Sequence, residues 1–229
     1  MSAEFLIDKG QYYKLIREEK MKKISLIIMS LVLTSVLHAD AFKLMGGANF
    51  LKYYQTSTAE TFEWNYKTGF CVGGGFEINL TDDAIFSVEV DAFYIQKKGG
   101  RVEEGASNQE AVFNLSTLCI PALFRARFKF DSPFYILGGG GVSFILSHKF
   151  EIKNGGSAFQ VDLKEEEITK GVDFGLVLGC GYEIKVNEFQ EVFIEARYHH
   201  GFANVLKDTE NYGAVKTSAI LIVLGLKTY

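Results

Sequence analysis

Apolar and polar residues alternate along eight stretches of this chain of 229 residues. In the stretch 118–130 every even position is apolar, and the odd positions end in Arg125, Arg127 and Lys129. Successive side chains of a β-strand point to opposite faces, so such a strand has one apolar face and one charged face. The pattern predicts strands at 41–54, 66–80, 85–97, 112–130, 134–148, 169–184, 191–204 and 214–228.

The segments between these strands alternate between short and long. Three are short, namely 81–84, 131–133 and 185–190, and four are long and polar, namely 55–65, 98–111, 149–168 and 205–213. Short turns at one end and long loops at the other are typical of an up-and-down barrel in a bacterial outer membrane. An even strand count places both ends of the barrel domain on the periplasmic side.

The two faces of the strands indicate which solvent surrounds the barrel. In a soluble, lipocalin-like barrel the apolar face would line a ligand cavity, whereas in a membrane barrel it meets lipid. The charged face here carries cations and anions in near balance, diluted by glycines, which suits a narrow lumen filled by paired side chains. We therefore predict an all-β, eight-stranded antiparallel transmembrane barrel over 40–229. Aromatic residues near the strand ends, among them Tyr53, Tyr94, Phe134, Tyr182 and Phe202, would form its interfacial girdles.

The first forty residues have the features of an export signal. Lys22 and Lys23 precede an apolar run at 24–36, and Ala39 supplies a small residue for cleavage. This pattern predicts a signal peptide at 21–39. Residues 1–20 are charged and unnecessary for export, so we interpret them as a non-native or mis-called extension, an amphipathic extension being the alternative. The net charge of −4, with no basic stripe, argues against nucleic-acid binding.

Four segments together resemble one known family. The runs 89–99, 118–123, 135–142 and 195–201 are similar, in order and spacing, to strands three, four, five and seven of the PorT-like, porin-family outer-membrane β-barrel proteins. The chain also ends in an aromatic residue, Tyr229, as terminal strands of this family do. In those strands the alternate positions before the aromatic residue are apolar, whereas here one of them is Lys227. The resemblance implies a location in a Gram-negative outer membrane, contact with outer-membrane lipids and insertion by the barrel-assembly machinery. It implies no defined activity, since members of the family are often called porin-like without one.

The sequence offers no evident catalytic, cofactor-binding or metal-binding site. Cys71, Cys119 and Cys180 are odd in number and widely spaced, which favours a wall-filling role. His200 lies on the apolar parity near the external end of its strand, and Ser218 is the one nearby nucleophile candidate. A lipid-modifying hydrolase is therefore kept only as a minor alternative. The acidic stretches 82–83 and 164–167 lack the spacing of a calcium loop.

Charged residues on the inward parity are expected to form a luminal network. Glu89 and Asp91 lie on one strand, and Arg125, Arg127 and Lys129 lie on the next one along the chain. We expect these groups to pair across the lumen, with Glu195 and Arg197 joining from the far wall. Such a network predicts a plugged barrel with a structural or binding role rather than an open pore.

The loop 149–168 is the candidate surface for interactions. Two alternating arms flank the Gly-rich turn 154–156, which predicts a hairpin standing above the membrane. An exposed strand edge can pair with a strand of another protein, so adhesion to an extracellular or envelope protein is the alternative function. We expect a monomer. The residues chosen for this surface are Phe150, Ile152, Asn154, Gly155, Phe159 and Val161.

Overall fold

The structure is a computed structural model that describes residues 38–56, 61–63, 65–103, 109–128, 132–154, 157–163, 169–205 and 214–229. Residues 40–229 form one compact unit. The predicted extension and nearly all of the predicted signal peptide lie outside the described residues. Among the residues that are described, no helix is long and apolar enough to cross a membrane.

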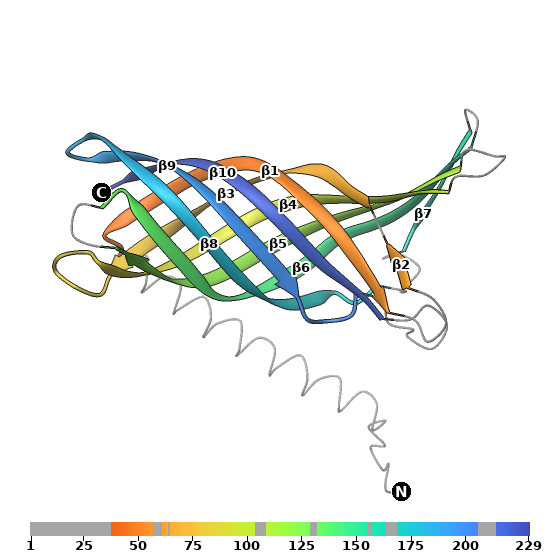
Figure 1. The fold of residues 1–229 in the computed structure, drawn as a ribbon, viewed down its shortest axis with the longest axis horizontal. Coiled ribbons are helices and arrows are strands. Elements are labelled where there is room, and N and C mark those ends of the chain that lie inside the picture. The colour runs from red at the N-terminus through yellow and green to blue at the C-terminus, as the bar shows by residue number, and fades with distance from the viewer. Residues whose placement is uncertain are drawn as a thin grey trace, which may run out of the picture. The chain divides into compact units, whose positions relative to one another are not determined.

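The described residues form ten β-strands, and eight of them close into a barrel (Figure 1). The barrel strands are β1 (Ala41–Thr56), β3 (Asn65–Asn79), β4 (Phe86–Glu103), β5 (Gln109–Arg127), β6 (Phe134–Asn154), β8 (Val172–Asn187), β9 (Gln190–Gly201) and β10 (Ala214–Thr228). The two short strands, β2 (Thr61–Glu63) and β7 (Ser157–Asp162), extend β1 and β6 as antiparallel partners. The predicted eight-stranded antiparallel barrel is thus confirmed, with predicted and observed ends that agree within a few residues at most strand ends.

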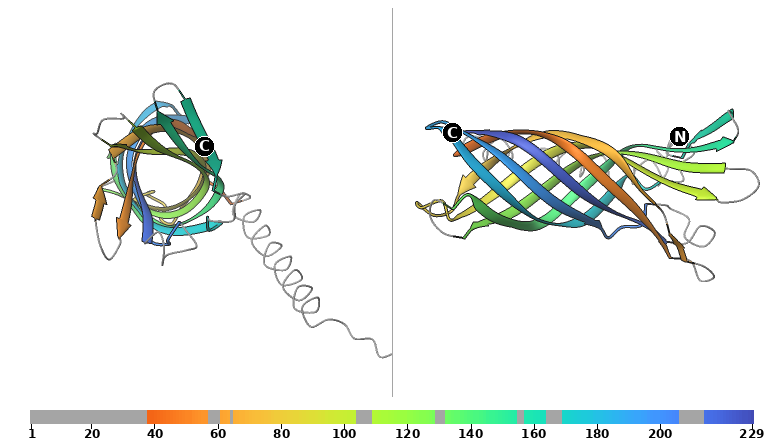
Figure 2. Two further views of the ribbon diagram at one scale, coloured as in Figure 1. Left: turned by 90° about the vertical axis from the view of Figure 1, so that its right-hand side faces the viewer. Right: turned by 45° about the horizontal axis from the view of Figure 1, so that its top comes forward.

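Pairing of the first strand with the last one closes the barrel. β1 and β10 pair without interruption from Phe42↔Thr228 to Thr56↔Ala214, and the view along the barrel shows a complete ring of strands (Figure 2). Lys43 and Lys227 stand opposite each other in this seam. Because every barrel strand has two neighbours, the membrane-spanning part has no free edge.

Burial follows the alternation of the sequence and confirms which face points outward. Lys43 is 5% exposed while the adjacent Leu44 is 69% exposed, and Asp173 is 7% exposed while Phe174 is 57% exposed. A soluble barrel would show the opposite assignment, with the large apolar residues inside. The charged parity therefore faces the lumen, and the apolar parity faces the surroundings of the barrel.

Several strands continue well beyond the ends that the sequence suggested. The predicted loop 98–111 is largely strand, because β4 and β5 stay paired as far as Glu103↔Gln109. β6 stops pairing with β8 at Phe144↔Val172 and then pairs with β7 up to Asn154↔Ser157. This is the hairpin predicted for the loop 149–168. The extension of β4 and β5 was not predicted, because a polar sequence can form a two-stranded ladder in water that apolar patterning alone does not detect.

One side-chain assignment differs from expectation. Tyr53 was expected in an aromatic girdle, but it is 2% exposed in the lumen, because it shares the inward parity of Asn49 and Leu51. Cys71 and Cys119 fill the barrel interior, whereas Cys180 is exposed on the outward face. Among the expected girdle residues, Phe134 and Tyr182 do meet on the outside, edge to face, with ring centroids 4.6 Å apart.

Candidate functional site

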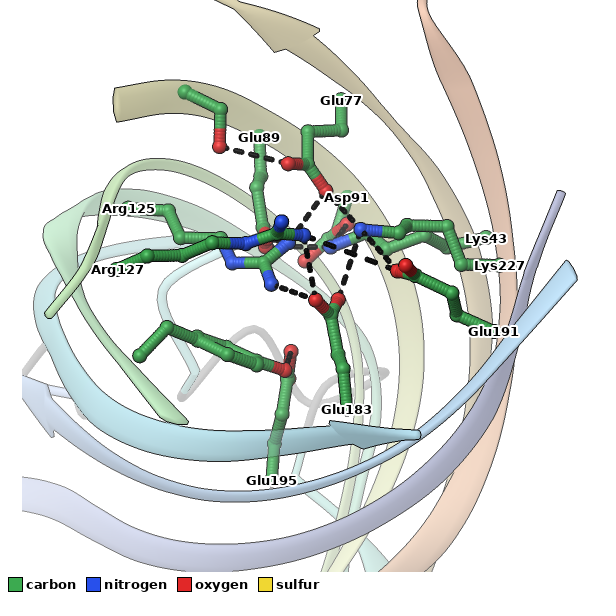
Figure 3. Close-up of polar contacts among 12 residues, drawn as sticks. Lys43, Glu77, Glu89, Asp91, Arg125, Arg127, Glu183, Glu191, Glu195 and Lys227 are labelled. Carbon is green, nitrogen blue, oxygen red and sulfur yellow. Dashed lines mark hydrogen bonds and ion pairs between the residues drawn. The ribbon is translucent and has the colours of Figure 1, made fainter. Parts of the chain in front are cut away.

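A network of ion pairs crosses the periplasmic half of the lumen (Figure 3). It joins side chains from seven of the eight barrel strands or their ends, and nearly all of these side chains are buried. Its cations are Lys43, Arg125, Arg127, Arg197 and Lys227, and its anions are Glu77, Glu89, Asp91, Glu183, Glu191 and Glu195.

The inner part of this network is centred on Arg197 of β9. Its Nη1 lies 2.6 Å from Asp91 Oδ2 on β4, and its Nη2 lies 2.5 Å from Glu195 Oε2 and 3.6 Å from Glu89 Oε2. Lys43 Nζ of β1 approaches the same carboxylates, at 2.5 Å from Glu89 and 3.2 Å from Asp91. Buried charges need such partners, because an isolated one is strongly disfavoured away from water.

The part nearer the periplasmic mouth is centred on Arg125 and Lys227. Arg125 contacts Glu183 on β8 and lies 2.6 Å from Glu77 Oε2 on β3. Lys227 Nζ of β10 lies 3.2 Å from Glu77, 2.9 Å from Glu183 and 3.1 Å from Glu191. Figure 3 shows the two carboxylates of Glu77 and Glu183 converging on these basic groups from different strands. An Arg125–Glu89 contact of 3.5 Å links this part to the inner one.

Tyr135 connects the network to the wall of β6. Its hydroxyl donates a hydrogen bond of 2.6 Å to Glu195 Oε1, and the Arg125 guanidinium lies over its ring at 3.7 Å from the centroid. The ring occupies the space beside Gly181 of β8, where an added Cβ would collide with it. The glycine therefore serves close packing at this position, which explains one of the glycines on the inward parity.

An apolar layer fills the lumen on the external side of the charges. Along β4 the inward residues change from Glu89 and Asp91 to Phe93 and Ile95, which are both fully buried. Arg197 lies 5.1 Å from the Phe93 ring centroid, so the two layers are in contact. The layer consists of Met45, Leu51, Tyr53, Cys71, Phe93, Ile95, Cys119, Ala219, Leu221 and Val223. Phe193, which lies between Glu191 and Glu195 on β9, belongs to the same cluster.

Polar side chains reappear beyond the apolar layer, towards the external end. Cys119 Sγ lies 3.9 Å from His199 Nδ1, and Asp173 Oδ1 accepts a hydrogen bond of 3.0 Å from the Ala203 amide. Across β9 and β10, His200 pairs in register with Ser218, which is only 2% exposed. His200 Nδ1 lies 3.2 Å from the Tyr198 hydroxyl.

Tyr229 closes the network at the end of the chain. It lies beyond the end of β10, and its hydroxyl donates a hydrogen bond of 2.8 Å to Glu191 Oε2. Burial raises the pKa of Tyr229 above its ordinary value, an effect that neighbouring Lys227 opposes. The hydroxyl therefore keeps its proton and remains a donor at neutral pH. This arrangement accounts for the shared parity of Lys227 and Tyr229.

The structure brings six of the seven network residues chosen from sequence into this cluster. Lys129 lies outside the described residues. Arg127 binds Glu183 and Glu191, at 2.8 Å and 3.8 Å, rather than an acid on β4. The sequence selection left out five members of the cluster. These are Lys43, Glu77, Glu183, Glu191 and Lys227, and their inward parity near the periplasmic strand ends was the signal that could have found them.

The residues chosen for the interaction loop are distributed over one hairpin. Phe150, Ile152 and Asn154 belong to β6, and Phe159 and Val161 belong to β7, while Gly155 lies outside the described residues. Within the described ranges, no group of three or more His, Cys, Asp or Glu residues is arranged to hold a metal ion.

Comparisons with known proteins place this architecture among membrane barrels. The model of the outer membrane protein beta-barrel domain matches residues 39–207. No curated protein matches the chain. Among solved structures, Neisserial surface protein A is similar at 16% identity, with 82% of this chain and 97% of that chain covered and a TM-score of 0.42.

Two further barrel structures are similar to the same degree. The attachment invasion locus protein Ail of Yersinia pestis shares 14% identity, covering 82% of this chain and 97% of its own, with a TM-score of 0.43. The outer membrane protein OprG of Pseudomonas aeruginosa shares 14% identity, covering 84% and 97%, with a TM-score of 0.42.

Proposed function

Because this chain belongs to the outer membrane protein beta-barrel domain family and resides in the bacterial outer membrane, we propose that it is a sealed barrel with a structural or binding role. The observation that carries this proposal is the two-layer filling of the lumen. Ion pairs such as Arg197–Asp91 connect opposite walls, and Phe93 and its neighbours fill the space directly beyond them. Ions would have to displace both layers in order to pass.

Conductance in planar lipid bilayers tests this proposal on the full chain. We expect no stable, large open state from the unchanged barrel. Replacing Arg197 and Phe93 together by glycine removes one member of each layer, and this variant should show conducting steps if it still folds. A heat-modifiable band on gels establishes folding. Leu178→Gly is the matched control, since Leu178 is 49% exposed on the outward face.

The conductance outcomes separate the two readings of the lumen. A stable, large open state of the unchanged barrel contradicts sealing and indicates a channel. The sealed barrel is supported if the unchanged barrel and Leu178→Gly show no conductance while the doubly substituted variant shows conducting steps. The ion selectivity of those steps would then report the carboxylates that lose the Arg197 guanidinium.

A second candidate function is adhesion through the hairpin of β6 and β7. β6 continues to Asn154, ten residues beyond its last pair with β8 at Phe144, and β7 pairs with it. Within the described residues, β7 pairs with no strand other than β6, so its outer edge can accept a strand of another protein. Deletion of residues 154–159 should abolish cell or partner binding without preventing barrel assembly. Binding that survives the deletion would rule out this function.

A further inference from the structure

An apolar groove of about 330 Å³ lies on the outward face of β6, β8 and β9. The cross-strand register accounts for its floor. Ile136 stands opposite Cys180, Cys180 opposite Ala196, and Ala196 opposite Ile222, so that two short side chains lie between two long ones. The outward surface is therefore hollowed over Cys180 and Ala196, in a band of the barrel that faces lipid.

Long side chains border the groove on its periplasmic side. The next outward row of the register consists of Phe134, Tyr182 and Ile194, and Phe128 projects from the end of β5 with 71% of its surface exposed. Phe134 and Tyr182 support each other edge to face at 4.6 Å. The shape suits a flexible hydrocarbon chain, which can lie along a floor of short side chains against aromatic walls.

A polar basin of about 600 Å³ adjoins the groove, and Tyr182 lines both. The basin lies at the periplasmic mouth of the lumen, where Ser132, Pro133 and the end of β8 face Glu191 and Tyr229. The Glu183 amide donates a hydrogen bond of 2.8 Å to Pro133 O, which holds these two parts of its rim together. Exposed groups of both signs line it, namely Lys185 from β8 and Glu188 from the following turn.

We infer that the groove and the basin together bind one glycerophospholipid of the periplasmic leaflet, with a zwitterionic headgroup that carries a phosphate and a primary ammonium. An acyl chain lies over Cys180 and Ala196. The headgroup reaches the basin past Tyr182, where Lys185 binds the phosphate and Glu188 binds the ammonium. Arg127, deeper in the basin, is engaged by Glu183 and Glu191 and belongs to the luminal network.

Position and charge select this occupant. The groove opens to the hydrocarbon region, and the basin lies at the end where β6 begins and β8 ends, which is the headgroup level of the inner leaflet. An anionic lipid without an ammonium group would bring no positive charge to Glu188 and would place a phosphate near it, which is unfavourable. A zwitterionic headgroup matches both Lys185 and Glu188.

Native mass spectrometry of the full chain in detergent micelles tests this site. Three probes are offered at equal concentration, namely phosphatidylethanolamine, phosphatidylglycerol and diacylglycerol. We expect the unchanged barrel to retain phosphatidylethanolamine about tenfold more than phosphatidylglycerol or diacylglycerol. Only phosphatidylethanolamine carries both the phosphate that Lys185 binds and the ammonium that Glu188 binds. Equal retention of all three probes would overturn the inference.

Substitutions separate the groove from the basin. Ala196→Phe fills the floor and should lower retention of phosphatidylethanolamine about tenfold, which corresponds to the loss of about two buried methylene groups. Cys180→Phe is a second variant for the same purpose should the first not fold. Leu44→Phe is the matched control, because Leu44 is 69% exposed on β1, outside the groove.

The headgroup variants make separate predictions. Glu188→Gln should remove the preference for phosphatidylethanolamine over phosphatidylglycerol. Lys185→Gln should lower the preference over diacylglycerol, because only the ammonium contact with Glu188 remains. Unchanged retention in Ala196→Phe and Cys180→Phe would overturn the assignment of the groove. A dimer mass that these variants abolish would identify a second copy as the occupant, and would overturn the inference as well.

Discussion

Arg197 on β9 is joined to Asp91 on β4, 106 residues earlier in the chain, by an Nη1–Oδ2 contact of 2.6 Å. In the strand order of the barrel these two strands stand four places apart in either direction, so they face each other across the lumen. The contact therefore connects opposite walls. Barrel stability should accordingly depend on this pair more than on ion pairs at the periplasmic mouth.

Replacing Arg197 by methionine should destabilise the barrel by about 3–5 kcal/mol, since Glu89, Asp91 and Glu195 would lose a buried partner. Urea unfolding of the protein refolded into lipid vesicles measures the difference. Arg127→Met is the control. Its side chain is 14% exposed at the mouth, where water can compensate, and we expect a loss of about 1 kcal/mol. Equal losses in the two variants would contradict the dependence on burial.

A methyl group at Gly181 should be far more costly than one at Gly140. The added Cβ at position 181 meets the Tyr135 ring and would displace the hydroxyl that donates to Glu195. We expect Gly181→Ala to lower the free energy of unfolding by about 1–3 kcal/mol. At Gly140 the nearest atom, Gly175 O, lies 3.9 Å from the added Cβ. Gly140→Ala should therefore change the free energy of unfolding by about 0.5 kcal/mol or less. The same unfolding assay compares them.

The three cysteines should differ in their reaction with a small maleimide in detergent micelles. Cys180 is exposed on the outward face, whereas Cys71 and Cys119 are each 2% exposed within the apolar layer. We expect the folded barrel to take up one label per chain and the urea-unfolded chain to take up three, as measured by intact mass. Rapid labelling of Cys71 or Cys119 before unfolding would show that the lumen admits reagents.

Proline should open the hairpin at one position of β7 and leave it paired at the neighbouring position. The Leu163 amide donates to His148 O, and the two-residue period of an antiparallel ladder then directs the amide of Val161 towards β6 and that of Gln160 towards the free edge. Val161→Pro should therefore open the hairpin, at a cost of about 3 kcal/mol, whereas Gln160→Pro should leave it paired. Trypsin cleavage after Lys153 reports the opening. Similar cleavage of both variants would argue against this register.

Much of the fold could be predicted from the alternation alone. Position 44 had to face lipid once position 43 faced the lumen, and the same reasoning applied along every barrel strand. The alternating arms of 149–168 also indicated the hairpin of β6 and β7. The outer parts of β4 and β5, in contrast, could not be predicted from alternation. Outside the membrane both faces meet water, so the sequence loses its apolar–polar contrast while the backbone ladder continues.

The luminal cluster could be predicted only in part. Parity indicates that Glu89 and Arg197 face inward, but the partner of each depends on how far every strand is displaced along the barrel axis relative to its neighbours. This displacement brings Arg127 to Glu183 on β8, not to the acids of β4. The apolar layer was missed for a related reason, since Phe93 and Leu221 reach the same level only after the barrel closes.

The seam between the first and last strands has a consequence for the order of assembly. Lys43 and Lys227 stand opposite each other there, and two like charges in a cross-strand pair repel. The carboxylates that offset this repulsion come from β3, β4, β8 and β9. We therefore expect the two ends of the sheet to join more favourably once the intervening strands have delivered their acids. An intermediate that lacks those strands, or holds them out of register, would leave the two lysines at the seam without their carboxylates.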